Sequence, residues 1–442
     1  MKTLSFVLLT LAVASGARAQ LSFFVTDRTN DSVYYLHDDN GNLVIDEPAE
    51  VTRWFGPGNA EGFAGVLNPN TIGYRRGTPL DAADAVCLIG DQDATARRVY
   101  WTQDLNGDSD AMDVGESGIF ADSSSGIGQW FAFPTGLAHD SSGVPHVVNA
   151  GNGFGPDAIW RCDDANADLD ANDTGETVPF TTYNGMCSTN SSAWSPQEIV
   201  FDAADVMFLR NSIANAHGVF RLYDFDGNGV VDTAAESSLW FGLGNLSGHT
   251  PSAGFAVDID PLRPHALYYQ SLATGGVDEV YRLVDGNGDD DAQDAGEATL
   301  VWTSAEAGLT LIDVCALADG SILVTDNSTK RVIRLTDLNN DGLFTGAGER
   351  ANVLAGSTIL GDVRNIAVVR DIPSGPVCDA IDYNGDGLFP DTADIDDFLS
   401  VFSGGPCSTG TCGDIDFNND GLFPDTADID ALLSVFSGGP CL

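Results

Sequence analysis

One thirteen-residue pattern recurs eight times along this chain and constrains its fold more than any other feature. In its clearest copy, at 285–297, the sequence reads DGNGDDDAQDAGE. Carboxylates or carboxamides occupy positions one, three and five, further acids occupy seven and ten, and a glutamate closes the pattern at thirteen. Short oxygen-bearing side chains on alternate residues, with glycine between them, let a loop curl and point oxygens inward, as calcium requires. We call each copy a frame and name it by its first residue.

The frames supply the candidate calcium ligands of this protein. In the first six copies these are Asp38, Asn40, Asn42 and Glu50; Asp104, Asn106, Asp108, Asp110 and Glu116; Asp164, Asn166, Asp168, Asp170 and Glu176; Asp224, Asp226, Asn228 and Glu236; Asp285, Asn287, Asp289, Asp291 and Glu297; and Asp337, Asn339, Asp341 and Glu349. In the last two copies they are Asp382, Asn384, Asp386 and Asp394, then Asp416, Asn418, Asp420 and Asp428, with backbone carbonyls from Leu388 and Leu422. The alternative is a metal-free turn, because Asp-Gly and Asn-Gly pairs also form plain hairpins.

The acidic charge of the chain is concentrated in these frames. The net charge is −46, and 36 of the 65 acidic residues lie in the eight frames, which cover 104 of 442 residues. If the acids served only to charge a solvated surface, they would be spread over the chain and would not recur at the same positions of each frame. Such a charge argues against nucleic acid and anionic membrane surfaces as partners.

The N-terminus has the pattern of a secretory signal peptide. A basic residue, Lys2, precedes the apolar run from Leu4 to Ala14, and Ala17-Arg18-Ala19 predicts cleavage before Gln20. No stretch is long enough to span a membrane as a helix. We therefore expect a secreted or cell-surface protein, with residues 1–19 removed.

Strands around the first six frames predict a β-propeller. A short apolar strand precedes each frame, and in five copies a second strand follows with an aromatic residue: Trp54, Phe120, Phe180, Trp240 and Trp302. Each of these frames is therefore the turn of a hairpin. Two further strands precede each hairpin, as at Thr135–His139 and Val144–Val148. Four short strands repeated about every 60 residues are typical of propeller blades.

The two ends of this region favour six blades. The unit that begins at Leu21 has only three strands, and Arg364–Val369 supplies a fourth at the other end, which predicts a ring closed by both termini. A count of seven, using the long Gly56–Pro79 stretch, is the alternative. The predicted fold class is mainly β, with a six-bladed propeller over 20–371, a linker over 372–377 and a small helical domain over 378–442.

The C-terminal region is an internal duplication. Residues 378–407 and 412–441 are near-identical, and each runs from a cysteine through a frame and an amphipathic helix to Ser-Gly-Gly-Pro-Cys. The helical stripes are Ile395, Phe398, Leu399 and Phe402, then Ile429, Leu432, Leu433 and Phe436. Two such helices can pack on each other around one small core.

These two segments resemble the tandem calcium-binding repeats of type I dockerins. The resemblance lies in DYNGDGLFPDTADIDDFL and DFNNDGLFPDTADIDALL, and the flanking ends resemble GC-type dockerin-like modules of secreted bacterial proteins. The closing acids, Asp394 and Asp428, stand at position thirteen, where the dockerin loop has its acid at twelve. The resemblance implies calcium-dependent binding of a cohesin-like or envelope receptor through Asp391-Thr392 and Asp425-Thr426. The propeller half resembles six-bladed propellers only in general terms, and its loops resemble calcium-binding hairpins of adhesive propellers.

Eight cysteines in an exported chain permit disulfides. By symmetry we favour the pairs Cys378–Cys407 and Cys412–Cys441, although four cysteines allow three pairings and spacing cannot choose among them. Cys87, Cys162, Cys187 and Cys315 are scattered, and no C-x-x-C, HExxH or G-x-S-x-G motif occurs.

Four arginines stand three residues before a frame: Arg161, Arg221, Arg282 and Arg334. We expect each to pair with loop carboxylates or to pack on an adjacent blade, because residues repeated once per blade usually serve the blade. A shared anionic substrate is the alternative. Trp54, Trp240 and Trp302 are expected to serve blade packing and not to form a platform for sugars.

Two functional hypotheses follow, and a purely structural surface protein is a third possibility. The favoured one is a non-catalytic, calcium-stabilised propeller that binds a glycan or an envelope component and attaches through its tail. The alternative is a polysaccharide-processing or other calcium-dependent hydrolase or lyase. An enzyme would carry acids, histidines or amides at the central channel, marked by departures from the repeat, and Gly56–Arg76 and Asn184–Ser195 are the irregular stretches that could supply them.

Overall fold

The structure is a computed structural model of the chain. It describes residues 21–76, 78, 80, 85–93, 97–122, 133–150, 157–182, 195–213, 217–233, 235–263, 265–272, 277–304 and 309–370, and, nearer the C-terminus, 383–385, 392–410, 412, 415, 417, 428–429, 432–433 and 436. Residues Leu21–Asp371 form one compact unit, and Ile372–Leu442 belong to a second. The predicted signal peptide lies outside the described residues.

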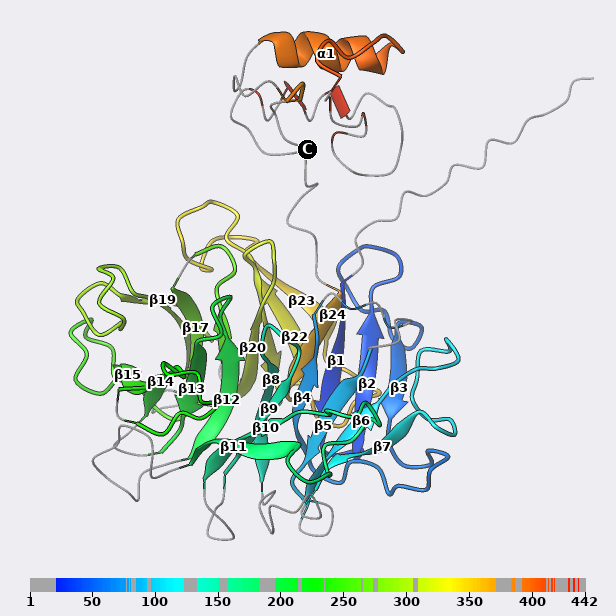
Figure 1. The fold of residues 1–442 in the computed structure, drawn as a ribbon, viewed down its shortest axis with the longest axis vertical. Coiled ribbons are helices and arrows are strands. Elements are labelled where there is room, and N and C mark those ends of the chain that lie inside the picture. Colours follow the sequence, from blue (N-terminus) through cyan, green and yellow to red (C-terminus); the bar gives the residue numbers. More distant parts are fainter. Residues whose placement is uncertain are drawn as a thin grey trace, which may run out of the picture. The chain divides into compact units, whose positions relative to one another are not determined.

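The described strands of the first unit form six antiparallel sheets of four strands each, and most of these strands are labelled in Figure 1. Blade 1 contains β24 (Ile366–Arg370), β1 (Ser22–Asp27), β2 (Ser32–His37) and β3 (Val51–Phe55), and blade 2 contains β4 (Pro69–Tyr74), β5 (Cys87–Asp91), β6 (Arg98–Thr102) and β7 (Ser117–Ala121). Blade 3 contains β8 (Pro134–His139), β9 (Pro145–Asn149), β10 (Ala158–Cys162) and β11 (Thr177–Thr182), and blade 4 contains β12 (Pro196–Phe201), β13 (Met207–Asn211), β14 (Gly218–Leu222) and β15 (Ser237–Gly242). Blade 5 contains β16 (Val257–Ile259), β17 (Ala266–Leu272), β18 (Asp278–Val284) and β19 (Ala298–Thr303), and blade 6 contains β20 (Leu311–Ala316), β21 (Ile322–Asp326), β22 (Arg331–Leu335) and β23 (Arg350–Ala355).

The ring closes through strands from both ends of the propeller sequence. β24 pairs with β1, with Phe23 opposite Val368 and Phe24 opposite Ala367. β24 also contacts the first strands of the blades on either side, β4 and β20. Pro69–Tyr74 is the first strand of blade 2, so the long stretch before it does not form a seventh blade. The prediction of a six-bladed propeller closed by both termini is confirmed.

The apolar cores of the propeller lie between consecutive blades. One cluster joins Phe24 and Trp54 of blade 1 to Ile72, Ile89 and Tyr100 of blade 2. Further clusters join blades 2 and 3, 3 and 4, 4 and 5, and 5 and 6. This arrangement explains the apolar side chains on both faces of the hairpin strands, because each sheet is covered on both sides by a neighbour.

The second unit contains α1 (Thr392–Phe402), the one helix for which the described residues give bounds. Described residues 428–429, 432–433 and 436 also have helical backbone. A small core joins Tyr383, Phe398, Ile415, Phe417 and Leu432. The predicted stripes are only partly buried, because Leu399 and Leu433 are 44% and 46% exposed. The tandem loop–helix arrangement expected here is therefore seen only in part.

Truncation of a tryptophan between blades should destabilise the ring. Trp54 is fully buried, and its Nε1 donates a hydrogen bond of 2.8 Å to Thr102 Oγ1 of blade 2. Trp54→Ala removes this packing and leaves the threonine hydroxyl without that donor, so we expect a loss of about 3–5 kcal/mol in the free energy of unfolding. Leu105→Ala, at a 61% exposed site in the same part of the ring, should change it by less than about 0.5 kcal/mol. Urea unfolding followed by fluorescence compares the two, and equal losses would contradict this account.

Candidate functional site

The first aspartate of each propeller frame organises the loop that follows it. Its carboxylate accepts hydrogen bonds of 2.6–3.3 Å from backbone N–H groups at positions four to six. In the frame at 285, for example, Asp285 accepts from Gly288, Asp289 and Asp290. Positive φ angles at Gly288 and Asp290 let the chain wrap around this carboxylate. All six first aspartates act in this way.

The closing glutamate of each propeller frame is buried and joins the two ends of the loop. Glu50, Glu116, Glu176, Glu236, Glu297 and Glu349 are all between 2% and 7% exposed. Glu297 is representative: Oε1 accepts from the N–H of Gly286 at 3.0 Å, and Oε2 accepts from the N–H of Asp294 at 2.9 Å. Positions one and thirteen therefore hold their carboxylates in place through the backbone.

A backbone hydrogen bond attaches each propeller frame to the preceding blade. The N–H at position eight donates to the carbonyl four residues after the closing glutamate of the previous frame, at 2.6–2.9 Å. The pairs are Ala111 with Trp54, Ala171 with Phe120, Val231 with Phe180, Ala292 with Trp240, Phe344 with Val301, and Ile45 with Val353. The last pair joins blade 1 to blade 6, so these bonds run around the whole ring. Every residue at position eight is buried.

The side chains between these fixed points bring acidic oxygens close together. In the frame at 224, ligand atoms of Asp224, Asp226 and Glu236 lie within 4.8 Å of one another. In the frames at 104, 164 and 285 an asparagine occupies position three, and its Nδ2 donates to carboxylates at positions five and ten, as Asn287 does to Asp289 and Asp294. The frame at 337 has only Asn339 with Asp341 in this arrangement, and the frame at 38 has Asn40 and Asn42 beside Asp46.

The donor chemistry of these loops fits a hard cation. Apart from the asparagine amides, the side chains that converge are carboxylates. At position seven, burial raises the pKa of Asp110, and the charges of Asp108, Glu116 and Asp113 raise it further. Burial and neighbouring acids raise the pKa of Asp291 in the same way. Like charges crowded on a fixed loop are the condition that a bound divalent cation relieves.

The repeated arginines serve the blades, as expected. Arg161 pairs with Asp163 at 2.8 Å, and Arg334 pairs with Asp319. Arg221 and Arg282 instead reach position six of the next blade's frame. Arg221 lies 3.5 Å from the carboxylate of Asp290, and Arg282 donates to the carbonyl of Gly342 at 3.0 Å. No shared anion site is formed by these four side chains.

The predicted ligands of the second unit are described only in part. Asn384, Asp394 and Asp428 are described, and all three are buried. The N–H of Asn384 donates to Asp394 Oδ1 at 3.3 Å, which links positions three and thirteen of the frame at 382. Thr392 begins α1. The remaining predicted residues lie outside the described residues: Asp382, Asp386, Leu388, Asp391, Asp416, Asn418, Asp420, Leu422, Asp425, Thr426, Cys378 and Cys441.

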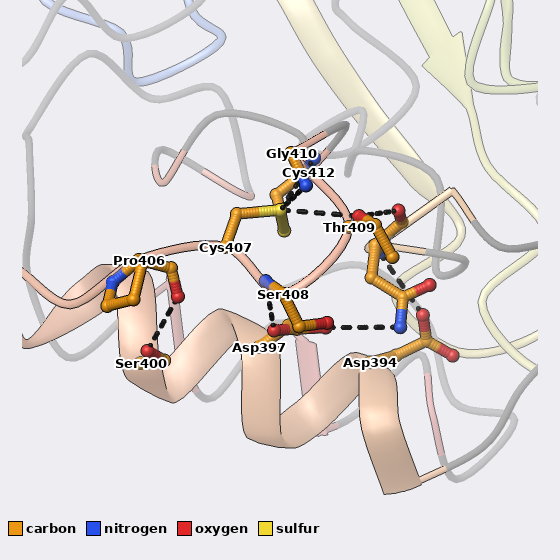
Figure 2. The surroundings of a disulfide bond; sticks show 10 residues. Asp394, Asp397, Ser400, Pro406, Cys407, Ser408, Thr409, Gly410 and Cys412 are labelled. Atoms are coloured by element: carbon orange, nitrogen blue, oxygen red, sulfur yellow. Dashed lines mark hydrogen bonds between the residues drawn. A yellow bond between two sulfur atoms is a disulfide. The ribbon is translucent and has the colours of Figure 1, made fainter.

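The disulfide pairing predicted by symmetry is wrong for the two described cysteines. Cys407 is joined to Cys412 across a separation of five residues (Figure 2). Ser408, inside this short loop, donates through its N–H and its hydroxyl to Asp397 of α1 at 2.9 and 2.6 Å. The bridge therefore closes the turn that joins the two repeats, whereas the symmetric pairing would have closed each repeat on itself. Cys87, Cys162 and Cys315 are buried and are not joined in a disulfide.

A cavity of about 280 Å³ occupies the central channel and is lined by the first strands of all six blades. Three acids face it that the sequence analysis did not single out: Glu198 on β12, Asp258 on β16 and Asp313 on β20. Each is the one charged residue in an otherwise apolar or neutral stretch of its strand, directly before Ile199, Ile259 or Val314. A single charged residue within an uncharged strand was the sequence signal that could have identified these acids. Alignment on the frames hid it, because these acids lie far from any frame.

The channel acids connect neighbouring first strands. Asp313 Oδ2 accepts from the N–H of Ile366 on β24 at 2.8 Å, and Asp258 Oδ2 accepts from the N–H of Ala316 on β20 at 2.7 Å. Glu198 accepts from the N–H of Leu137 on β8. Each acid therefore bonds a strand of an adjacent blade.

Burial makes these acids hold their protons more tightly. Burial raises the pKa of Asp313 to about 7, although N–H donors from Ile366 and Val314 oppose the shift. Burial, followed by the charge of Asp313, raises the pKa of Glu198 well above its usual range. The pKa of Asp258 is also raised by burial, against the opposing charge of Arg76. A carboxyl group with a pKa near neutrality beside ionised neighbours can act as a general acid or base.

Basic and polar groups lie beside the acids in the channel. The Arg76 guanidinium lies 3.7 Å from the Asp258 carboxylate and donates to Cys315 Sγ at 3.0 Å. Arg76 belongs to one of the two irregular stretches expected to depart from the repeat, and the other, apart from Ser195, lies outside the described residues. Burial lowers the pKa of His139 to about 4, so its imidazole is neutral at physiological pH. The channel therefore offers oxygen donors for a cation and polar contacts for a ligand.

Among the described residues, no helix is both long and apolar enough to cross a membrane.

Comparison with known proteins adds only distant likenesses. No protein-family model matches the chain, and no curated protein matches it. A chain of a nidogen–laminin complex is 12% identical with a TM-score of 0.49, covering 79% of this chain and 98% of that chain. Streptogramin B lyase is 11% identical with a TM-score of 0.41, covering 78% and 86%. A protein of unknown function from Bacteroides caccae is 8% identical with a TM-score of 0.43, covering 80% and 100%. Likenesses at this level assign no activity.

The raised pKa values predict a pH dependence of stability. Because the Asp313 carboxyl has a pKa near 7 in the folded chain and about 3.8 in the unfolded chain, the folded state binds the extra proton between these values. Its contribution to stability is present at acidic pH and is lost as pH rises towards 7, with a slope of up to about 1.4 kcal/mol per pH unit. Asp313→Asn should flatten this part of the profile. Unfolding free energies at saturating calcium measure it, and parallel profiles for the variant and the parent chain would contradict the assignment.

Proposed function

We propose that this protein is an exported, calcium-stabilised propeller that binds a glycan or another envelope component, and that its C-terminal module attaches it to a receptor. The observation that supports calcium most directly is the ring of position-eight bonds. These bonds fix six acidic loops against the blades, so cations in the loops would stabilise the junctions between blades. The proposed ligands are the frame residues named above, with positions one and thirteen already oriented.

The bound calcium ions would act as structural cations. Calcium would supply positive charge and six to eight coordination positions for oxygen. The chain itself would supply the first aspartate and closing glutamate, which are held by backbone N–H groups, the aspartate or asparagine side chains at positions three and five, and the acids that some frames have at seven and ten. Where a frame has few acids, as at 337, weaker binding is expected.

The C-terminal module is proposed as the attachment device. This part rests on the resemblance to dockerin repeats, which implies two calcium loops followed by helices. Thr392 at the start of α1 and the corresponding Asp391, Asp425 and Thr426 would face a cohesin-like or envelope receptor. The buried Asp394 and Asp428 suit closing ligands, since a buried carboxylate next to a loop gains most from a cation.

An enzyme of the hydrolase or lyase class is the second candidate. The observation that favours it is the channel itself, where Asp313 has a pKa near 7 and Arg76 lies beside Asp258. Asp313 would donate or accept the proton, and Arg76 would hold an oxyanion or carboxylate of the substrate. A hydrolase and lyase panel on the calcium-loaded protein tests this. Turnover that is abolished by Asp313→Asn would replace the binding hypothesis with a catalytic one.

Calcium should raise the melting temperature, and a single frame variant should reduce that gain without harming the metal-free fold. Asp226→Asn keeps the oxygen that accepts the N–H of Asn228 but removes one charge from the Asp224, Asp226 and Glu236 cluster. The calcium-induced stabilisation follows RT ln(1 + [calcium]/Kd), so a tenfold loss of affinity at this site lowers it by about 1.4 kcal/mol at saturation.

Thermal melting with calcium and with a chelator measures this difference. Asp205→Asn is the matched control, because Asp205 is an acid of a nearby turn that bonds Ser141 and belongs to no frame. Equal melting temperatures of the parent chain with calcium and with chelator would contradict the calcium proposal. An equal loss in both variants would show that the effect is one of surface charge.

A further inference from the structure

We propose that the groove between blades 2 and 3 is a binding site for a neutral oligosaccharide, with Trp101 as the platform for one sugar ring and the chain running towards the central channel. This inference rests on the proposed binding function and specifies where the glycan binds and what charge it carries.

Trp101 departs from the repeat at a position that otherwise joins blades. It stands three residues before its frame, the place of Arg161, Arg221, Arg282 and Arg334 in blades 3 to 6. In blades 4 and 5 that arginine extends to position six of the next frame, which is Asp290 or Gly342. For Trp101 in blade 2, position six of the next frame is Leu169. The polar link of blades 4 and 5 is therefore replaced here by two apolar side chains, Trp101 and Leu169.

A second departure makes room for the indole. Gly118 is the cross-strand partner of Trp101, and a Cβ at this position would lie 2.4 Å from Trp101 Nε1 and 2.7 Å from Cε2. The corresponding partners in the other blades are Thr52, Val178, Ser238, Thr299 and Ala351. The indole therefore lies across β7 in a way that the side chains of the other blades would prevent. The indole packs on the apolar core between blades 2 and 3, and the two coordinated departures at facing positions distinguish this junction from the others.

A cavity remains beside the indole. It has a volume of about 390 Å³, and the corresponding grooves between blades 3 and 4, 4 and 5, and 5 and 6 have about 330, 260 and 100 Å³. Its walls are Trp101, Phe120 and Leu169 on the apolar side, and Arg75, Ser142 and Asp164 on the polar side. Trp101 is only partly buried, so part of its surface is exposed to the groove. An apolar pocket with a few polar groups is the usual form of a small-ligand site.

The groove and the channel cavity share two lining residues. Arg75 and His139 line both cavities. His139 is neutral at physiological pH, so its imidazole can donate one hydrogen bond and accept another. A ligand with several hydroxyl groups could therefore extend from Trp101, past these two side chains, to the acids on β12, β16 and β20.

The chemistry of the walls selects the ligand class. A pyranose ring has an apolar C–H face, which suits the electron-rich face of an indole, and hydroxyl groups at its edge, which suit charged and polar side chains. The groove has charges of both signs, because Arg75 faces it together with Asp163, which is already paired with Arg161, and Asp164, which is the first proposed calcium ligand of its frame. An anionic sugar would meet these acids and the net charge of −46, and a cationic ligand would meet Arg75. A neutral sugar avoids both conflicts.

The test uses a variant that restores the repeat. Trp101→Arg combined with Gly118→Thr gives blade 2 the pair that blade 5 has in Arg282 and Thr299, so the fold should be kept while the platform is lost. Trp101→Ala removes the platform alone. The probes are the hexasaccharides of cellulose, xylan, mannan and laminarin, with hexagalacturonate and choline as the anionic and cationic comparisons. Titration calorimetry at saturating calcium measures binding.

We expect at least one neutral hexasaccharide to bind with a Kd of roughly 1 mM or tighter, and both variants to weaken it at least about tenfold. Gly118→Val alone should also weaken it, because it displaces the indole without removing it. No binding of any neutral probe at about 1 mM overturns the inference, and so does binding of hexagalacturonate or choline in their place. Binding that survives both variants but is lost in Asp258→Asn would place the sugar in the channel. That result would leave the proposed binding function intact and reject this site.

Discussion

The hydrogen bond from position eight of each frame to the outer strand of the preceding blade is the interaction on which the rest of this structure depends. Apolar packing between blades is strong but has no fixed direction, so it does not by itself set how far one sheet rotates against the next. A backbone bond from a fixed point of one blade to a fixed point of its neighbour does set it. Because the same bond recurs from Ile45 on Val353 to Phe344 on Val301, the geometry repeats until the ring closes.

The channel acids provide a second connection nearer the axis. Asp313 and Asp258 each accept an N–H from the first strand of an adjacent blade, whereas each frame donates an N–H to the outer strand of the preceding blade. The two connections differ in their desolvation free energy. A backbone pair is neutral, whereas a buried carboxylate with a raised pKa is desolvated and partly protonated near pH 7. A purely structural connection would not need such groups. Their presence favours the channel as a ligand site as well as a junction between blades.

Much of the fold could be predicted from the sequence, because the repeat reports on local structure. The acids recur at the same positions of each frame, and the strands on either side of the frames are apolar and short. The first unit has only three strands, so it requires a fourth from the C-terminal end of the propeller region. The channel could not be predicted in the same way. Glu198, Asp258 and Asp313 come from three different blades and meet only because the ring closes. The pairing of Cys407 with Cys412 was missed for a related reason, since symmetry between repeats says nothing about the connection that joins them.

Residues that obey the repeat and residues that break it have different explanations in this protein. A side chain present in four of the six blades, such as the arginine before the frame, is explained by its contacts with nearby loop acids or with the next blade. A side chain that replaces it gives up that contact, so some other interaction must favour it or the junction is weakened for no gain. Trp101 gives up the arginine link, and Gly118 gives up a strand side chain to accommodate it, at two positions that face each other. The indole packs on the apolar core between blades 2 and 3, and the two changes at this junction lie next to a cavity that shares lining residues with the central channel, where a ligand would account for both together.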